Sequence, residues 1–577
     1  MKKPYSKIGD FNLTGRLTIP SGIITTTPET MLKFAMESEL GIITSKSIGP
    51  KPRKGNPAPI LYQQNKYTLL NAVGLTNPGI EAYVAEMKEI REVWPANKFC
   101  LTSIFAGDKN VGDVVDGDTK QNLVYVAKLA KEVSDGLELN FGCPHSGGLA
   151  QIGRSPEIVE ELTAAVVEAV DVPVLVKLTP SAYDIAAVAK AAENSRAAGI
   201  VAINTVGPGR TQHLYTKGGS ISGNSIKTIG VRCVHDIANA VDLPIIGMGG
   251  ITSIDDVLDY KNAGADFFGI GSSLIGKPTK VVFKYLSETD RAYKLNRNWN
   301  YYPLCNFDQP VSRTITEIND VSKDIRIIKM DYHILDGPGM FMMLQTEGGE
   351  AKPFSIANNW PLTFAVRKVG ESTSRMFELK QGDKLKLGGP YGKQIGKTVL
   401  KDLGSDIYLV GGGTGIAPLN MIAGYIKNNE SKLGITVRAI IGAKTKDELI
   451  FEESLKRSCK KVYITTDDGS YCERGFVTNI LENVLSEMGY AQKRGFINCG
   501  PEVMTKKVVE IEKKHMSNPT KILCGVERYT KCGMGGCGSC EINGFRACVD
   551  GPFFSFGDIE PALGVYKRDA TGAKVKT

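Results

Sequence analysis

The sequence lacks the features that mark several large classes of protein. No segment has the roughly 18 uninterrupted apolar residues of a membrane-spanning helix. The first residues, MKKPYSKIGDFNL, do not contain the apolar stretch of a secretory signal. No basic run carries interleaved aromatic residues, and a net charge of +8 is small for 577 residues. We therefore expect a cytoplasmic protein without integral membrane contact and without nucleic acid as a partner.

The sequence is also free of internal repeats and low-complexity segments, and its length predicts several domains, each with its own core. It contains 12 cysteines. Because thiols stay reduced inside cells, metal binding, catalysis or simple burial explains these cysteines better than disulfides do.

The first 295 residues alternate short β-rich runs with helix-like segments. Eight strands alternating with helices predict a (β/α)₈ barrel, an α/β fold whose chemistry lies at the C-terminal ends of its strands. An open, doubly wound sheet is the alternative. The predicted strands are residues 17–24, 41–46, 99–105, 136–142, 174–178, 199–206, 244–250 and 267–273.

The remaining residues fall into four predicted segments. Residues 296–310 show no clear period and are interpreted as a linker. Strand-like runs with turn residues over 311–398 predict a small antiparallel β-barrel. Residues 399–515 return to strand–helix alternation, which predicts a parallel nucleotide-binding sheet. Residues 516–577 form a small domain that contains a cysteine cluster.

This cluster, KCGMGGCGSCEINGFRAC, has the spacing C-x4-C-x2-C-x7-C. A C-x4-C-x2-C run with a fourth cysteine further on is typical of plant-type [2Fe–2S] proteins. A structural zinc site is the alternative, but it usually pairs cysteines as C-x2-C twice, and only the middle pair here does so. The predicted iron ligands are Cys532, Cys537, Cys540 and Cys548.

A glycine-rich turn, GGGTGIAP at 411–418, follows a strand-like run and begins a helix-like one. Backbone N–H groups in such a turn can bind a diphosphate. After a later strand, Asp467 and Asp468 stand where an NADP enzyme needs cations, which favours NAD. The predicted dinucleotide contacts are Gly412, Gly413, Thr414 and Gly415.

Residues 311–560 resemble the ferredoxin-reductase superfamily, and specifically the electron-transfer component of class 1B dihydroorotate dehydrogenases. KPFSI (352–356) occupies the place of the flavin motif R-x-[YF]-S, GEST (370–373) that of a diphosphate contact, and DGPFF follows the cysteine motif. The resemblance implies bound FAD, although Lys352 in place of arginine weakens a bidentate phosphate contact. The implied FAD contacts are Lys352, Pro353, Phe354, Ser355, Gly370, Ser372 and Thr373.

The barrel half resembles the catalytic component of the same family in LLNAVGLTNPG, LELNFGCPH, VKLTP and other stretches, so the chain looks like a fusion of the two components. The resemblance implies oxidation of dihydroorotate to orotate, with Cys143 as the base that takes the C5 proton. Placement of asparagines after successive strands favours ring binding over a turn role. The implied substrate contacts are Lys46, Asn71, Gly74, Leu75, Asn140, Asn204 and Thr205. The implied FMN contacts are Ser45, Lys46, Lys177, Gly249, Gly250, Gly271 and Ser272.

Two residues depart from the family pattern: Gly142 replaces a serine before the catalytic cysteine, and His145 replaces an asparagine after it. His145 is typical of enzymes that act on uracil and thymine, so a dihydropyrimidine dehydrogenase or related ene-reductase is the alternative. Val73, where those enzymes place an acid, and the absence of [4Fe–4S] cysteine runs favour dihydroorotate.

The expected enzyme belongs to pyrimidine biosynthesis and carries electrons from FMN through [2Fe–2S] and FAD to NAD⁺. Two further alternatives are a protein or quinone acceptor in place of NAD⁺, and an electron carrier with an inactive barrel. We also expect a homo-oligomer that assembles through the barrel.

Overall fold

The computed structural model describes residues 5–106, 117–142, 152–295, 310–335, 337–488, 493–515 and 518–577. These form two compact units. The first contains residues 1–307 with Met534–Phe545 and Arg568–Lys574. The second contains residues 308–533 with Arg546–Lys567 and Val575–Thr577. The predicted linker at 296–310 lies, except for its last residue, outside the described residues.

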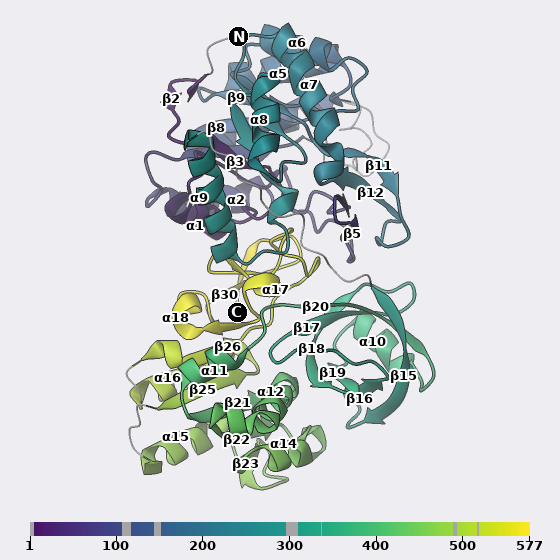
Figure 1. The fold of residues 1–577 in the computed structure, drawn as a ribbon, viewed down its shortest axis with the longest axis vertical. Helices are drawn as coiled ribbons and strands as arrows, with labels where there is room; N and C mark the ends of the chain where they lie inside the picture. The colour runs from purple at the N-terminus through teal and green to yellow at the C-terminus, as the bar shows by residue number, and fades with distance from the viewer. Residues whose placement is uncertain are drawn as a thin grey trace. The chain divides into compact units, whose positions relative to one another are not determined.

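The first unit is built on a closed barrel of eight parallel strands, which confirms the predicted fold (Figure 1). Neighbours along the chain are neighbours in the barrel, and the strands end earlier than predicted. In chain order they are β3 (Leu17–Ile19), β4 (Ile42–Thr44), β7 (Phe99–Ile104), β8 (Gly136–Asn140), β9 (Val174–Lys177), β10 (Gly199–Ala202), β13 (Ile245–Met248) and β14 (Phe267–Gly269).

Helices surround the barrel and bury their apolar faces against the strands (Figure 1). Local sequence sets where they begin: Thr27 caps the first, accepting from the Thr30 amide at 3.3 Å, and Pro28 stands at its first turn. The helices are α1 (Pro28–Glu37), α2 (Ile80–Arg91), α3 (Gly117–Ala130), α5 (Pro156–Ala169), α6 (Ile185–Asn194), α7 (Lys227–Ala240), α8 (Ile254–Asn262) and α9 (Thr279–Leu295), with short 3₁₀ turns η1 (Lys131–Val133), η2 (Asn224–Ile226) and η3 (Ser272–Leu274).

Two small antiparallel sheets accompany the barrel. One is the pair β1 (Lys7–Ile8) and β2 (Phe11–Asn12). The other has four strands in the order β11-β12-β6-β5. It joins segments about 150 residues apart in the chain, as in the pairing of Leu70 with Ile221. Its strands are β5 (Leu61–Asn65), β6 (Thr68–Asn71), β11 (Val206–Arg210) and β12 (Gly218–Ser222). This second sheet was not among the predicted elements.

The second unit begins with a closed six-stranded antiparallel barrel, as predicted. Its interior is filled by side chains such as Ile328, Leu344 and Phe364. The strands are β15 (Val311–Asp320), β16 (Ile325–Met330), β17 (Phe341–Gln345), β18 (Lys352–Asn359), β19 (Leu362–Arg367) and β20 (Lys384–Tyr391), with helix α10 (Glu371–Glu378) after β19.

A seven-stranded sheet follows, in the order β24-β23-β22-β21-β25-β26-β29, and all its pairs are parallel except β26 with β29. Its strands are β21 (Asp406–Gly412), β22 (Thr436–Ala443), β23 (Lys461–Thr466), β24 (Glu473–Arg474), β25 (Arg494–Cys499), β26 (Ile522–Gly525) and β29 (Phe553–Ser555). Its helices are α11 (Lys397–Leu403), α12 (Ile416–Asn428), α13 (Glu430–Leu433), α14 (Glu452–Ser458), α15 (Val477–Met488) and α16 (Glu502–Lys514), with 3₁₀ turns η4 (Gly413–Gly415), η5 (Lys446–Glu448) and η6 (Pro519–Lys521).

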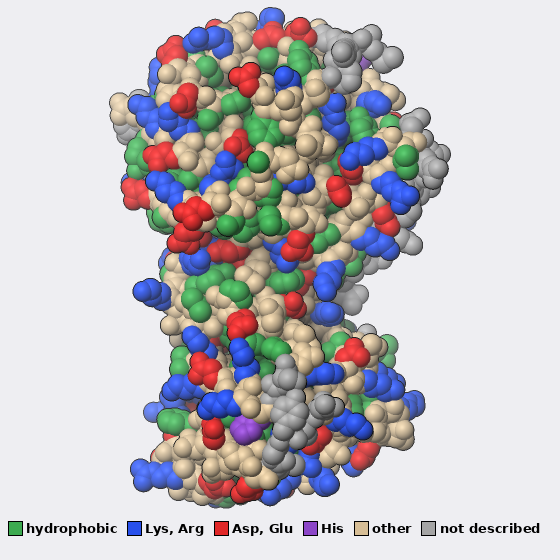
Figure 2. Space-filling model, turned by 90° about the vertical axis from the view of Figure 1, so that its left-hand side faces the viewer, with side chains coloured by type: hydrophobic (Ala, Val, Ile, Leu, Met, Phe, Trp, Pro, Cys, Tyr) green, Lys and Arg blue, Asp and Glu red, His purple; other side chains and the backbone are tan. Residues whose placement is uncertain are grey.

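The C-terminal residues form short elements around the cysteine motif: β27 (Glu541–Ile542), β28 (Phe545–Arg546), α17 (Ala547–Asp550), α18 (Phe556–Ile559), β30 (Tyr566–Arg568) and β31 (Lys574–Lys576). Among the described residues, no helix combines the length and the apolar character needed to cross a bilayer. On the face shown in Figure 2, lysine and arginine side chains are interspersed with acidic ones, in keeping with the small net charge.

Candidate active site and redox centres

Two of the predicted ring-binding asparagines meet at the mouth of the barrel. Asn140 is the last residue of β8, and Asn204 follows β10. The Asn204 Nδ2 donates to Asn140 Oδ1 at 3.0 Å, and Asn140 Nδ2 donates to Ser47 Oγ at 2.8 Å. The Thr205 amide donates to Asn204 Oδ1 at 2.8 Å. These bonds fix both amide planes, so their remaining donors and acceptors are preorganised for a ligand that carries N–H and C=O groups.

Gly142, which replaces the serine of the family pattern, lies against this pair. A Cβ at this position would fall 3.1 Å from Asn204 Nδ2 and 3.2 Å from Thr179 Cβ. The glycine therefore permits a closer approach of Asn204 than a serine would. Cys143 and His145, the predicted base and its neighbour, lie outside the described residues.

Asn71 is placed differently from the expectation that all three asparagines follow successive barrel strands. It ends β6 of the four-stranded sheet, where its Nδ2 donates to the Ser220 carbonyl at 3.4 Å. The turn that follows has left-handed backbone at Gly74 (φ 78°) and Leu75 (φ 52°). Such backbone is uncommon for leucine and costs strain, a feature often found at ligand sites. Carboxylate binding by this turn stays a prediction.

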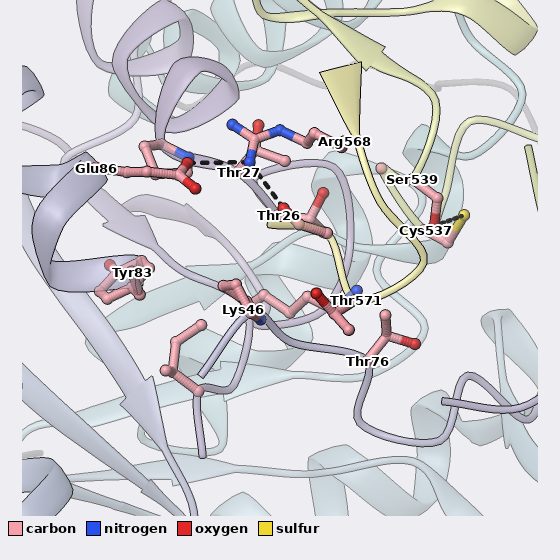
Figure 3. Close-up of a pocket in the computed structure, with 15 residues that line it drawn as sticks. Thr26, Thr27, Lys46, Thr76, Tyr83, Glu86, Cys537, Ser539, Arg568 and Thr571 are labelled. Atoms are coloured by element: carbon pink, nitrogen blue, oxygen red, sulfur yellow. Dashed lines mark hydrogen bonds and ion pairs between the residues drawn. The ribbon is translucent and has the colours of Figure 1, made fainter. Parts of the chain in front are cut away.

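Two lysines lie at or just after the C-terminal ends of barrel strands, at the same mouth. Lys177 ends β9, and its Nζ lies 2.9 Å from Ser21 Oγ and 3.5 Å from Glu138 Oε1. The Lys177 and Glu138 side chains are 4% and 1% exposed, so the lysine has a buried counter-charge. Lys46 follows β4 and is buried beside Ser45, whose Oγ accepts from the Ser103 amide at 3.0 Å. Figure 3 shows Lys46 lining a cavity with Tyr83 and Thr76.

The predicted phosphate-binding glycines lie at the ends of the last two barrel strands. Gly249 (φ 121°) and Gly250 (φ 77°) follow β13, and a Cβ on Gly250 would fall 2.9 Å from both the Gly223 carbonyl and the Lys227 amide. The backbone therefore closes tightly against the start of α7, where free amides favour an anion. Asn224 Nδ2 donates to the Gly250 carbonyl at 2.8 Å. These features fit the phosphate of FMN. Gly271 and Ser272 follow β14.

In the small barrel, the predicted FAD residues Lys352, Pro353, Phe354 and Ser355 form the first half of β18 and are each partly exposed. Lys352 pairs with Glu350 at 2.8 Å and lies over the Tyr529 ring at 5.3 Å. The Lys352 ammonium thus already has a carboxylate partner, in keeping with its reduced value as a phosphate ligand.

The predicted diphosphate segment begins α10. No atom lies within 4 Å of a Cβ added to Gly370, so the approach there is open. Thr373 Oγ1 accepts from the amides of Val369 and Gly370, at 2.9 and 3.0 Å, and so holds the start of the helix. Ser372 is partly exposed in its first turn. This open helix start fits a diphosphate.

The glycine-rich turn does follow a strand and begin a helix, as predicted: Gly412 ends β21, residues Gly413–Gly415 form η4, and α12 begins at Ile416. It packs directly on residues 499–502 (CGPE), which join β25 to α16. A Cβ on Gly415 would fall 2.6 Å from the Cys499 carbonyl carbon and 2.7 Å from the Gly500 amide nitrogen. Only glycine allows this contact. The turn and residues 499–502 both lie at the C-terminal ends of the neighbouring strands β21 and β25, where nucleotides usually bind to such sheets.

After β23, Asp467 is exposed. Partial desolvation together with the charge of Asp468 raises its pKa. Asp468 is exposed and accepts from the Ser470 amide at 2.9 Å. Neither residue offers a cation to a 2′-phosphate, which keeps NAD the favoured dinucleotide.

The four predicted iron ligands, Cys532, Cys537, Cys540 and Cys548, are all buried. Gly533, Gly535 and Gly538 adopt left-handed backbone, which lets the loop turn sharply between the first three cysteines. No three His, Cys, Asp or Glu side chains of the described residues converge as they would around one metal ion. A [2Fe–2S] cluster needs only two cysteines at each iron. Cys524, outside the motif, is fully buried in β26, and burial raises its pKa well above the ordinary value.

Comparison with known proteins covers both halves of the chain. Residues 5–290 match the family profile described as dihydroorotate dehydrogenase. Residues 409–510 match an oxidoreductase NAD-binding domain, and residues 527–560 match the iron–sulfur cluster binding domain of dihydroorotate dehydrogenase B. A relative from Pyrococcus abyssi, named as the catalytic subunit of dihydroorotate dehydrogenase B (NAD(+)), is 37% identical over 265 residues, which are 45% of this chain and 83% of that protein.

Two more relatives extend the match. The corresponding catalytic subunit of Pyrococcus furiosus is 36% identical over 296 residues, 50% of this chain and 93% of its own length. A probable electron transfer subunit of dihydroorotate dehydrogenase B (NAD(+)) from Methanocaldococcus jannaschii is 38% identical over 273 residues, 46% of this chain and 99% of its own length. The chain belongs to the dihydroorotate dehydrogenase B family.

Membership of the dihydroorotate dehydrogenase B family confirms the resemblance found in the sequence, including the joining of both components in one chain. The individual site residues remain predictions. Sequence reasoning did not single out Ser21, Ser47 or Glu138, which orient predicted site residues through the contacts given above. Glu138 carried a detectable signal, because an acid within the apolar strand GLELN is unusual in a barrel interior.

Proposed function

We propose that this chain oxidises dihydroorotate to orotate at the barrel mouth and passes the electrons to NAD⁺. FMN supplies hydride acceptance at the barrel, the [2Fe–2S] cluster supplies single-electron transfer, and FAD supplies two-electron exchange with NAD⁺. The family relatives are dihydroorotate dehydrogenases named for NAD(+), which supports the enzyme class, the cofactor set and a place in pyrimidine biosynthesis.

The observation that carries the proposal is the pair Asn140 and Asn204, hydrogen-bonded at 3.0 Å at the ends of two barrel strands. In this proposal the pair holds the N–H and C=O edge of the pyrimidine. Cys143 takes the proton from C5, and Lys46 lies near the substrate carboxylate. Lys177, paired with Glu138 at 3.5 Å, would place positive charge beside the N1–C2 side of a bound flavin ring.

The base assignment is tested with Cys143→Ser in the full-length, cofactor-replete protein. A serine hydroxyl is a much weaker acid than a thiol, so it cannot take up and release the C5 proton at neutral pH in the same way. We expect orotate formation to be abolished or greatly slowed while the flavin content is retained. Unchanged turnover would show that another group is the base.

The substrate and the electron route have separate tests. Under anaerobic conditions, dihydroorotate should bleach the flavin and dihydrouracil should not; the opposite result would favour a dihydropyrimidine dehydrogenase. In Cys537→Ala, dihydroorotate should still reduce FMN, but NADH should no longer form. Coupling that survives this change would refute the route through the cluster. Failure of NADH to bleach the wild-type flavins would exclude NAD⁺ as the acceptor.

We also propose a cytoplasmic location and assembly into a homo-oligomer through the barrel. The Tyr183 side chain, in the loop after β9, is fully exposed and is a candidate for burial in such an assembly. Sedimentation of the wild type and of Tyr183→Ser tests this. A monomeric wild type would refute assembly altogether, and an oligomeric Tyr183→Ser variant would refute assembly through this residue.

A further inference from the structure

Part of the cysteine segment belongs to the barrel unit, where it contacts loops at the strand ends. Ile24, after β3, donates its amide to the Gly536 carbonyl at 3.1 Å. Gly276, after β14, donates its amide to the Met534 carbonyl at 2.7 Å. A Cβ on Gly538 would fall 2.8 Å from Thr26 Cβ, so only glycine allows the segment to pack this closely. The segment 534–545 therefore lies against the C-terminal mouth of the barrel.

A small cavity lies between this segment and loops of the barrel (Figure 3). Lys46 and Thr76 line it from the barrel, and Cys537 and Ser539 line it from the cysteine segment. About 20 Å³ is open to the centres of water-sized molecules, which is room for about one water. A predicted flavin contact and a predicted iron ligand thus line the same cavity.

Arg568 lines this cavity and forms ion pairs with three carboxylates from three separate elements. Its Nε lies 2.8 Å from Glu541 Oε2, its Nη1 lies 3.0 Å from Glu86 Oε2, and its Nη2 pairs with Glu29. Glu29 is on α1, Glu86 is on α2, and Glu541 directly follows Cys540 in the chain. The Arg568 side chain is 1% exposed. Each of its three nitrogens therefore links a different part of the unit to one buried guanidinium.

The charges of this cluster depend on Arg568. The other cation is Lys574, 3.2 Å from Glu29 Oε1 and 32% exposed. Burial opposes the charge of Arg568, but Glu29, Glu541 and Glu86 together raise its pKa, so it stays a cation. Without Arg568, the buried carboxylate of Glu541 and the mostly buried ones of Glu29 and Glu86 would repel one another, and among the described residues Lys574 is the cation that would remain paired with Glu29. The ion pairs that join α1, α2 and the cysteine segment through Arg568 would then be lost together.

We propose that Arg568 is a positioning residue for electron transfer from the barrel flavin to the iron–sulfur cluster. By holding Glu541 against α1 and α2, it fixes the neighbouring Cys540 and keeps Cys537 at the cavity that Lys46 lines. The inference rests on the proposed function. In that function, a bound reduced flavin would give up its two electrons singly and lose its protons to solvent, and FAD would reoxidise the cluster after each electron.

The test uses the full-length protein with all cofactors, mixed with dihydroorotate in an anaerobic stopped-flow instrument. Flavin bleaching and cluster reduction are followed separately, the latter also by electron paramagnetic resonance. Arg568→Met should leave flavin bleaching unchanged and slow cluster reduction severalfold, because the rate of electron transfer falls steeply as the two redox groups move apart. Arg568→Lys should recover only part of the rate, since an ammonium cannot bind three carboxylates in the fixed geometry of a guanidinium.

Arg91→Met is the matched control. Arg91 is on α2, the helix that carries Glu86. It forms a bidentate pair with Asp135, at 2.7 and 3.1 Å, but it does not line the cavity. Both phases should keep wild-type rates in this variant. If cluster reduction slows equally in Arg91→Met, the effect comes from general loosening of α2 and the proposal is wrong.

Glu86→Gln covers the case in which Arg568→Met does not retain its cluster. It keeps the shape of the side chain, removes one charge and is remote in sequence from the cysteines. Slow cluster reduction with full iron content supports the proposal, and wild-type rates in both variants overturn it. If dihydroorotate does not bleach even the wild-type flavin, the proposed function fails instead. The positioning role is then tested with NADH as reductant. Electron transfer from the cluster to the barrel flavin should be slowed in Arg568→Met, because it uses the same arrangement in the opposite direction.

Discussion

Replacing Gly415 by alanine should disable the nucleotide site while leaving the barrel reaction intact. Gly415 lies at the start of α12 with ordinary right-handed backbone (φ −63°, ψ −13°). Alanine adopts this conformation without strain, so any effect of the substitution comes from the added methyl group and not from the backbone.

The size of that effect follows from what the methyl group would meet. It would lie 2.6 Å from the Cys499 carbonyl carbon and 2.7 Å from the Gly500 amide nitrogen. Unbonded heavy atoms prefer about 3.5–4.0 Å, so the turn must move away from Cys499 by about 1 Å. Both neighbours are backbone atoms within a strand end, and neither can turn aside. Overpacking of this kind costs about 1–3 kcal/mol of stability. A displacement of about 1 Å at a binding turn predicts up to about a hundredfold loss of NAD⁺-dependent rate.

The assay compares two half-reactions of one purified protein. NADH-driven reduction of ferricyanide reports the nucleotide and FAD side, and anaerobic bleaching by dihydroorotate reports the barrel. Gly415→Ala should lose most of the first activity and keep the second. Gly424→Ala is the control in the same helix, where an added Cβ has nothing within 4 Å. Alanine there should stabilise α12 by about 0.8–1.0 kcal/mol and leave both activities unchanged.

Wild-type NADH oxidation by Gly415→Ala would refute the reasoning, because it would mean that the turn and residues 499–502 need not touch. Loss of both activities would also refute it, since the defect would then not be confined to the nucleotide side.

Two further predictions concern buried ionisable side chains. Burial raises the pKa of Glu512 well above its ordinary value of 4.5. The folded protein therefore holds a proton that the unfolded chain releases, so stability is greatest below the ordinary pKa and falls by up to about 1.4 kcal/mol per pH unit above it. Calorimetry should find that Glu512→Gln melts higher than wild type at about pH 8 but not at about pH 4; equal melting at both would contradict this. Separately, Glu138→Leu should lower the free energy of unfolding by about 3–5 kcal/mol by leaving Lys177 unpaired. Denaturant titration should show that adding Lys177→Met costs less than the two single losses combined, whereas strictly additive losses would show that the pair does not interact.

Much of the fold could be predicted because its strands are locally distinctive. Strands of a parallel barrel are buried on both faces, so a segment such as IIGM in β13 shows as a continuous apolar run. The positions of Lys177 and Asn140 at strand ends followed directly from that assignment. The glycine-rich turn was equally visible, since its residues are required by backbone contacts that no other residue allows.

The four-stranded sheet could not be predicted in the same way. Its strands include LYQQN and GGSIS, which are polar or glycine-rich and lack the β-branched residues that mark a strand. Their stability comes from pairing across about 150 residues, as between Leu70 and Ile221. Asn71 was therefore expected after a barrel strand, whereas it ends a strand of this sheet.

The Arg568 cluster has no local signal at all. Its carboxylates on α1 and α2 are 539 and 482 residues away in the chain. An arginine in YKR near the C-terminus gives no sign that it will be buried, because burial of a charge depends on partners that only the folded chain supplies. The predicted domain limits, which keep residues 516–577 together, stay a prediction; the compact units assign 534–545 and 568–574 to the barrel.

The order of strands in the barrel separates the arrival of substrate from the departure of electrons. The asparagine pair follows β8 and β10, whereas the cysteine segment contacts the loops after β3 and β14. In the closed barrel β3 and β14 are neighbours, and at least one other strand separates each of them from β8 and β10. Lys46, after β4, lies between these two positions in strand order, whereas Lys177, at the end of β9, lies between the two asparagine strands. A flavin held at this mouth would therefore meet substrate on one side and the cluster on the other, so electron removal need not wait for orotate to leave. This is why a shift of the Arg568 cluster should slow the exit of electrons and spare the chemistry of dihydroorotate.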